Sequence, residues 1–205
     1  MRIKNRWFKS ELPRGPRDVA GGVAFIAWRV AQQALKNMRQ ADFEIPAGPL
    51  YFAFLAEWLI FLTQIADRLA YERMSAEDRA EFTGTVANRL GAILEENRDM
   101  LLGDADMEVG SFKGRFIGLL NQRAEDYAAH DYQDAEAESG PDYGFLRQLA
   151  IELVQVVGEA DRVWVHDQVM EIEAPEAAAT LRRGVLGLLG EEPRPVRRGA
   201  GVSGD

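Results

Sequence analysis

The longest apolar stretch of the chain, Leu50 to Ala66, constrains its fold more than any other feature. It reads LYFAFLAEWLIFLTQIA, and Glu57 stands near its middle. Its length reaches the lower limit for a membrane-spanning helix, but a carboxylate near the centre of a bilayer is costly. We therefore expect a buried helix at the centre of a globular domain. Its large apolar surface also leaves open a second position, in a symmetric homodimer interface.

The rest of the chain shows the same helical periodicity. Apolar side chains recur at helical spacing in six segments, namely residues 18–40, 48–73, 75–103, 112–136, 143–172 and 175–189. In the fifth segment the pattern places Val163 and Val165 on the buried face. No short stretch alternates cleanly between turn signals, so we expect no substantial sheet. The sequence predicts an all-α fold, a single-domain bundle of about six helices.

Several residues are typical of helix ends. Asp18, Ser75 and Ser111 stand where a side chain can cap a helix N-terminus. Pro175 predicts a boundary between two helices, because its ring clashes with a preceding helical turn. Gly190 predicts the end of the last helix.

The two ends of the chain differ from its centre in charge and composition. Residues 1–17 hold six basic residues against one acidic residue, and residues 190–205 are rich in proline and glycine. We therefore expect a basic flexible arm at 1–17, a helical domain at 18–189 and a disordered tail at 190–205. An amphipathic basic arm is able to contact an anionic membrane.

Charge and composition also bear on partners and location. The whole chain has a formal net charge of -9, so its acidic body disfavours nucleic acid. No secretory apolar run follows the basic N-terminus, which favours a cytoplasmic protein. Arginine supplies 20 of the 24 basic residues, a bias typical of GC-rich bacterial genomes.

Motif searches exclude several classes of enzyme. The chain has no cysteine, so it has neither a thiolate metal site nor a cysteine nucleophile. It also lacks the P-loop pattern G-x-x-x-x-G-K-[ST] and the G-x-S-x-G pattern of serine hydrolases. The sequence therefore assigns no catalytic residues and no cofactor-binding residues.

The two histidines are each followed by aspartate, at His130-Asp131 and His166-Asp167. This pattern resembles the HD-type phosphohydrolases, an all-helical family. The resemblance implies a metal held by His130, His166 and Asp167, and a metal-activated hydroxide that attacks phosphate. The family's final aspartate has no counterpart here except Asp205, in the predicted tail.

An acidic cluster suggests a second metal site. Glu95, Glu96 and Asp99 form an E-E-x-x-D pattern near a helix end. It is similar to the magnesium site of MazG-like nucleotide pyrophosphohydrolases. The resemblance implies a further carboxylate on a neighbouring helix, for which Glu152 or Glu159 is available. Oxygen ligands of this kind suit magnesium, but a solvated helix face has the same composition.

Glu57 is the strongest candidate for a buried polar site. A carboxylate within the most apolar helix needs a partner or a raised pKa. Arg29, Arg68 and Arg123 are the candidate partners. We expect a structural ion pair, and the alternative is a ligand-binding or proton-handling site in the core.

These observations favour a non-enzymatic α-helical interaction or regulatory protein that needs no cofactor. Its expected partner is another protein or a second copy of itself. The alternative is a metal-dependent phosphohydrolase or nucleotide pyrophosphohydrolase on a helical bundle, which would require a divalent metal ion.

Overall fold

Side-chain caps mark the starts of two helices that the sequence predicts. The computed structural model describes residues 15–103, 111–134, 139–158 and 161–191. Ser75 caps helix α3 (Ala76–Leu102) by accepting a hydrogen bond from the N–H of Asp78, and Ser111 caps α4 (Phe112–Ala128) in the same way. Both caps agree with the sequence prediction. The predicted tail from residue 192 and the membrane contact of residues 1–14 lie outside the described residues.

The N-terminal helix begins slightly earlier than predicted. Helix α1 (Pro16–Gln40) starts at a proline, whose fixed φ angle suits a first helical position. Asp18 therefore lies in the first turn and is not the cap, which is Gly15. The last two residues of the expected arm thus belong to the helix.

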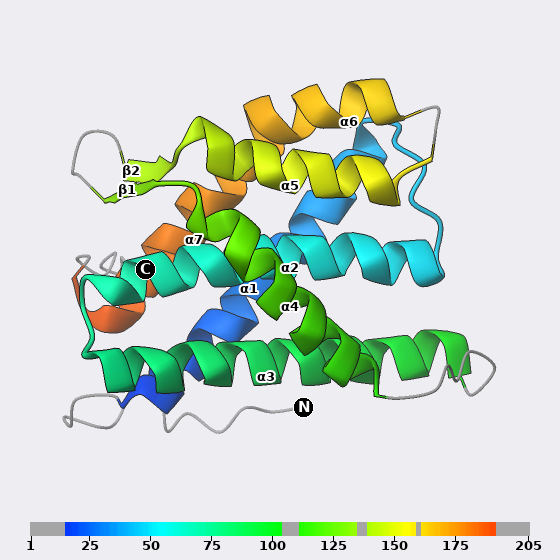
Figure 1. Ribbon diagram of the computed structural model, residues 1–205. Helices are drawn as coiled ribbons and strands as arrows, with labels where there is room; N and C mark the ends of the chain where they lie inside the picture. Colours follow the sequence, from blue (N-terminus) through cyan, green and yellow to red (C-terminus); the bar gives the residue numbers. More distant parts are fainter. Residues whose placement is uncertain (1–14, 104–110, 135–138, 159–160, 192–205) are drawn as a thin grey trace, which may run out of the picture.

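Helix α2 (Pro49–Tyr71) lies at the centre of the bundle. It packs against α1, α3 and α4, and also against α5 (Tyr143–Val156) and α7 (Ala174–Leu189). In Figure 1, α3 runs alongside α2 and α4 crosses both. By length and composition α2 could cross a membrane, but 72% of its most apolar window is buried within the chain. The interpretation as a central core helix is confirmed.

Two predicted segments differ from the structure at their C-terminal ends. The segment 112–136 is helical only to Ala128, because Arg68 donates hydrogen bonds to the backbone oxygens of Tyr127 and His130 at the end of α4. A short hairpin follows, in which β1 (Tyr132–Asp134) pairs antiparallel with β2 (Ser139–Pro141). The described residues contain no other strand, so the fold is all-α.

The segment 143–172 breaks into two helices. Helix α5 ends at Val156, the next residue is extended, and α6 (Arg162–Gln168) begins after a new turn. The break changes the helical phase, so Val165 is buried as expected but Val163 is 72% exposed. The prediction that Val163 faces the core is wrong.

The last predicted helix, 175–189, agrees with α7 to within one residue, and Pro175 lies in the first turn of α7. The sequence did not predict how this helix joins the preceding one. Helix α6 continues through a π-helical turn, η2 (Val169–Glu173), directly into α7. Proline removes one N–H donor and its ring disturbs regular α-helical packing. The π-turn changes the hydrogen-bond register just before Pro175, which lets the helix continue. Helix α7 ends, as predicted, at Gly190 in the left-handed conformation.

Candidate functional site

Glu57 lies where the sequence predicts, inside the core on α2. It is only 5% exposed, and its Oε1 lies 3.2 Å from Nη2 of Arg123 on α4. Arg123 is thus the partner, from the three arginines considered. Arg68 instead caps the end of α4, and Arg29 is exposed on α1.

Arg123 joins three helices through carboxylates. Besides Glu57, its guanidinium forms an ion pair with Glu152 on α5, and its Nη1 lies 3.8 Å from Asp126 one turn along α4. Gln148 donates a 2.8 Å hydrogen bond to Glu152 Oε1 and so fixes that carboxylate. We call Glu57, Arg123, Asp126 and Glu152 the Arg123 cluster. Sequence periodicity did not find it as a unit, because its members are far apart in the chain.

The electrostatics of the Arg123 cluster favour protonation of its buried acids. Burial raises the pKa of Glu57, against the lowering effect of Arg123, and the negative charges of Glu152 and Asp126 add to the rise. Burial likewise raises the pKa of Glu152. Three carboxylates share one guanidinium, so the cation compensates them only in part. The cluster therefore favours uptake of a proton on falling pH.

The polar atoms around the Arg123 cluster are incompletely paired. Oε2 of Glu57 and the hydroxyl of Tyr127 are buried without a hydrogen-bond partner among the described residues. Burial, followed by the charges of Glu57 and Glu152, raises the pKa of Tyr127 well above its ordinary value. Glu57 and Glu152 are shielded from solvent, whereas Asp126 is exposed at the edge of the cluster, so the two buried acids are the ones suited to hold a proton.

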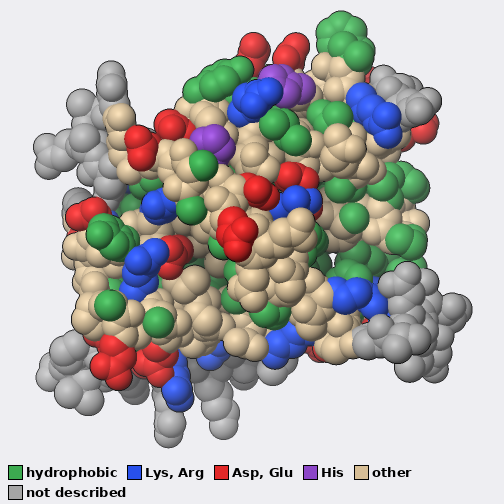
Figure 2. Space-filling model, viewed as in Figure 1, with side chains coloured by type: hydrophobic (Ala, Val, Ile, Leu, Met, Phe, Trp, Pro, Cys, Tyr) green, Lys and Arg blue, Asp and Glu red, His purple; other side chains and the backbone are tan. Residues whose placement is uncertain are grey.

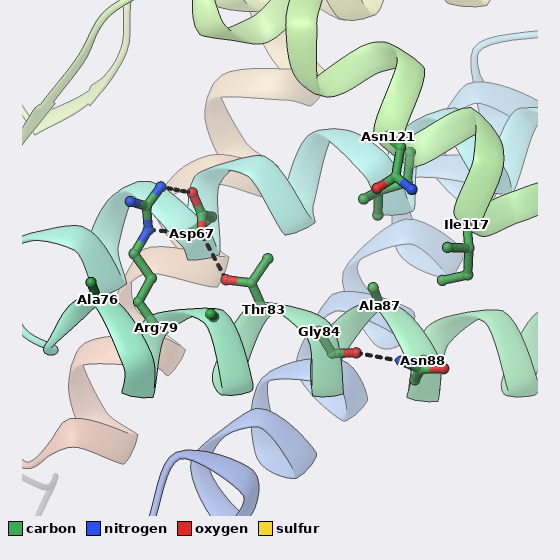
Figure 3. A pocket seen from close by; sticks show the side chains of 11 residues that line it. Asp67, Ala76, Arg79, Thr83, Gly84, Ala87, Asn88, Ile117 and Asn121 are labelled. Atoms are coloured by element: carbon green, nitrogen blue, oxygen red, sulfur yellow. Dashed lines mark hydrogen bonds and ion pairs between the residues drawn. The ribbon is translucent and has the colours of Figure 1, made fainter.

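A second polar group lines a pocket of about 390 Å³ beside α2, α3 and α4 (Figure 3). Asp67 Oδ1 accepts hydrogen bonds from Arg79 Nε at 3.0 Å and from Thr83 Oγ1 at 2.6 Å. Asn88 in turn donates to the backbone oxygen of Gly84. The contacts of Asp67 with Arg79 and Thr83 tie α2 to α3, so we interpret this ion pair as structural.

The structure does not gather the predicted metal ligands into one site. His130 lies just beyond α4 with its ring against Gly144. His166 lies on α6, and its Nδ1 is 3.2 Å from the carboxylate of its neighbour Asp167. The histidines form two separate patches in Figure 2. Within the described residues, no group of three or more histidine, aspartate or glutamate side chains could hold a metal ion.

The acidic cluster on α3 has a role in capping. Glu95 accepts hydrogen bonds from Ser111 Oγ at 2.7 Å and from the N–H of Lys113 at 3.1 Å, at the start of α4. The Ser111 hydrogen bond, with smaller help from Lys113, lowers the pKa of Glu95. Asp99 pairs with Arg98 at 2.9 Å.

The structure describes one of the two further carboxylates considered for that site. Glu152 belongs to the Arg123 cluster, and Glu159 lies outside the described residues. Glu96, the remaining carboxylate of the sequence pattern, lies on the exposed face of α3.

Two exposed large apolar side chains stand next to each other on α6. Val163 is 72% exposed and Trp164 is 67% exposed, and hydrophobic side chains protrude above this helix in Figure 2. The helical spacing did not predict this surface, because residues 143–172 were treated as one continuous helix across Gly158. That glycine, before the Asp161-Arg162 pair, was the available signal for a break.

Comparison of the chain with protein-family models, with curated proteins and with solved structures found no match. The proposals that follow therefore depend on the residues and geometry of this chain.

Proposed function

We propose that this protein is a non-enzymatic helical interaction protein of the cytoplasm, which associates with a second copy of itself through α6. The observation that carries the proposal is the exposure of Val163 and Trp164 side by side on that helix. Tryptophan is among the residues most enriched at the energetic centre of protein interfaces. Full burial of one such apolar side chain contributes about 1.5–3 kcal/mol.

The position of α6 suits a contact surface. Val165 is fully buried, and α6 packs against α5. The exposed face is therefore presented on a supported element. Such a surface loses little conformational entropy on binding.

The charges of α6 favour a second copy of the chain as the partner. Arg162 stands at the start of the exposed face and Asp167 near its end. In a two-fold contact the same surface faces itself, and residue i of one copy meets residue j of the other. Two antiparallel α6 helices would place Arg162 of each copy beside Asp167 of the other, with the apolar side chains between them.

The enzymatic alternative lacks comparable support. A metal-dependent phosphohydrolase needs several convergent ligands, and the described residues contain no such group.

Sedimentation velocity of the full chain over a concentration series tests the proposal. We expect a monomer–dimer equilibrium for the wild type and a monomer for Trp164→Glu. Tyr143→Glu is the matched control, because this aromatic is 68% exposed at the start of α5, and it should leave the dimer intact. Thermal melting checks that both variants fold.

A charge exchange tests the orientation of the dimer. Arg162→Asp and Asp167→Arg should each weaken association, and the double variant should restore it. A wild type that stays monomeric at high micromolar concentration would refute the proposal. A dimer insensitive to Trp164→Glu would show that another surface makes the contact.

A further inference from the structure

The pocket of about 390 Å³ beside α2 is an apolar groove between α3 and α4, which we call the α3–α4 groove. Ala76, Ala80 and Gly84 line it from α3, and Ile117 and Leu120 line it from α4. Figure 3 shows the two helices facing each other across it. The three α3 residues are exposed, so the groove is open to solvent. Its volume lies within the range of about 300–1,000 Å³ typical of small-molecule sites, which leaves room for a large aromatic side chain.

The chain enters the fold next to this groove. Helix α1 begins below the first half of α3 in Figure 1, and Arg17 in its first turn forms an ion pair with Glu81 of α3. Glu81 directly follows Ala80, which lines the groove. The lining residues of α3 extend from Ala76 to Asn88, a length of about 18 Å along the helix. The start of α1 and the groove thus lie on two sides of the same part of α3.

The segment that precedes α1 has a sequence suited to this groove. Residues 1–14 lie outside the described residues, and positions 6–9 read RWFK, with Trp7 and Phe8 between two cations. Phe8 is seven residues from Gly15, where the described chain begins, so it reaches at most about 25 Å from that point. This reach exceeds the diameter of α3, about 10–12 Å, so the aromatic side chains are able to cross the helix and enter the groove.

Acidic side chains without a cation flank the groove at two places. Glu77 follows Ala76 in the first turn of α3, and Glu125 lies on α4 one turn beyond Asn121, which lines the groove. Both carboxylates are exposed, and neither takes part in an ion pair among the described residues. Residues 1–14 hold five basic residues and one acidic residue. The segment and the edges of the groove are therefore complementary in charge.

The basic side chains of the surrounding helices do not cancel this complementarity. They are held in other contacts, namely Arg79 with Asp67, Arg17 with Glu81, Arg89 against Gly21 and Lys113 against Gly91. The first two are neutralised by their partners. Arg89 faces α1, on the other side of α3, and Gly91 lies beyond the last groove residue of α3.

We propose that the α3–α4 groove is the docking site of the N-terminal segment of the same chain, with Trp7 and Phe8 in the groove and the basic residues toward Glu77 and Glu125. Aromatic side chains are the usual anchors of such contacts. The tether to α1 gives the segment an effective concentration on the order of millimolar, so that a small contact suffices to hold it. The docking occurs within one copy and is separate from the self-association through α6.

Paramagnetic relaxation enhancement in the full chain tests the proposal. The chain has no cysteine, so Ser10→Cys supplies a single attachment point for a nitroxide, two residues from Phe8. We expect the amide signals of residues 76–88 and 117–121 to be broadened and those of α6 to be unaffected. Broadening confined to another element, or no selective broadening, would overturn the proposal. Mixing nitroxide-labelled chains with isotope-labelled chains that lack the nitroxide reports on contacts between copies, and groove broadening in that mixture would overturn docking within one chain.

Two variants of the nitroxide-labelled chain distinguish docking from mere proximity to α3. Gly84→Phe fills the groove, and a Cβ at that position meets open space, so the core is not disturbed. The double change Trp7→Ser and Phe8→Ser removes the two anchors. Each variant should restore most of the lost groove signal. Gly187→Phe on α7 is the matched control, because a Cβ there also meets open space, and it should leave the broadening unchanged.

Broadening that persists in both groove variants would refute the assignment. Thermal melting, followed by circular dichroism, checks that the variants fold.

Discussion

Replacing Arg123 with methionine removes the only cation of the Arg123 cluster while keeping much of the volume of its side chain. Glu57 and Glu152 are 5% and 8% exposed, so both carboxylates would stay buried without a counter-charge. Breaking a buried ion pair in this way costs about 3–5 kcal/mol. We expect the free energy of unfolding of Arg123→Met to fall by this amount at neutral pH.

The pH dependence gives this prediction its specific signature. Burial raises the pKa of Glu57 and of Glu152 above the ordinary value of 4.5. An acid with a raised pKa in the folded state stabilises the fold fully below 4.5, and this stabilisation is lost as the pH rises through the raised value. Because Arg123 lowers both pKa values, its removal raises them further. The deficit of the variant should therefore be largest near neutral pH and shrink as the pH falls toward 4.5.

Urea denaturation followed by circular dichroism, at about pH 7.5 and about pH 5, measures this difference. Arg147→Met, at an exposed position on α5, is the control and should stay within about 0.5 kcal/mol of the wild type at both pH values. A deficit of Arg123→Met that is equal at the two pH values, or larger at the acidic one, would refute the electrostatic reasoning.

Three further substitutions test other parts of the structure. Glu57→Gln keeps the shape of the side chain and cannot ionise, so urea denaturation should give a stability within about 1 kcal/mol of the wild type at neutral pH and a weaker loss of stability above pH 4.5. A cost of several kcal/mol would show that the charge of Glu57 is needed. Ser111→Ala removes the cap of α4 and a hydrogen bond to Glu95, so we expect a loss of about 1–2 kcal/mol and, by NMR titration, a higher pKa of Glu95. An unchanged pKa would contradict the assigned role of Ser111. Asp67→Asn weakens the ion pair with Arg79, and a fall in melting temperature equivalent to about 1 kcal/mol should follow, whereas an unchanged melting temperature would show that this pair is too exposed to matter.

Periodicity predicted the helical fold because apolar residues at helical spacing report directly on burial. It identified α2 as the core helix, and the pattern around Ser75 and Ser111 located two helix starts. It failed where tertiary contacts decide the backbone. The end of α4 depends on Arg68, a distant residue, and the passage through Pro175 depends on a π-turn that no local pattern signals.

The candidate site was predictable only in part. A carboxylate in an apolar helix implied a buried partner for Glu57, and Arg123 was among the choices. The addition of Glu152 required the packing of α5 against α2, which sequence spacing does not specify. The exposed face of α6 was not predictable from spacing, because the helix breaks near Gly158 and its periodicity starts again. The groove between α3 and α4 was not predictable either, because it is formed only when those helices pack together.

Hydrogen–deuterium exchange of the full chain at low and high protein concentration tests the proposed self-association most directly. If two copies meet through α6, the backbone amides of Arg162–Gln168 should exchange more slowly at high concentration, and Trp164→Glu should remove that difference. Amides of α3, which lies outside the proposed contact, should exchange equally at both concentrations. Exchange in α6 that does not depend on concentration, or protection confined to another element, would contradict the account.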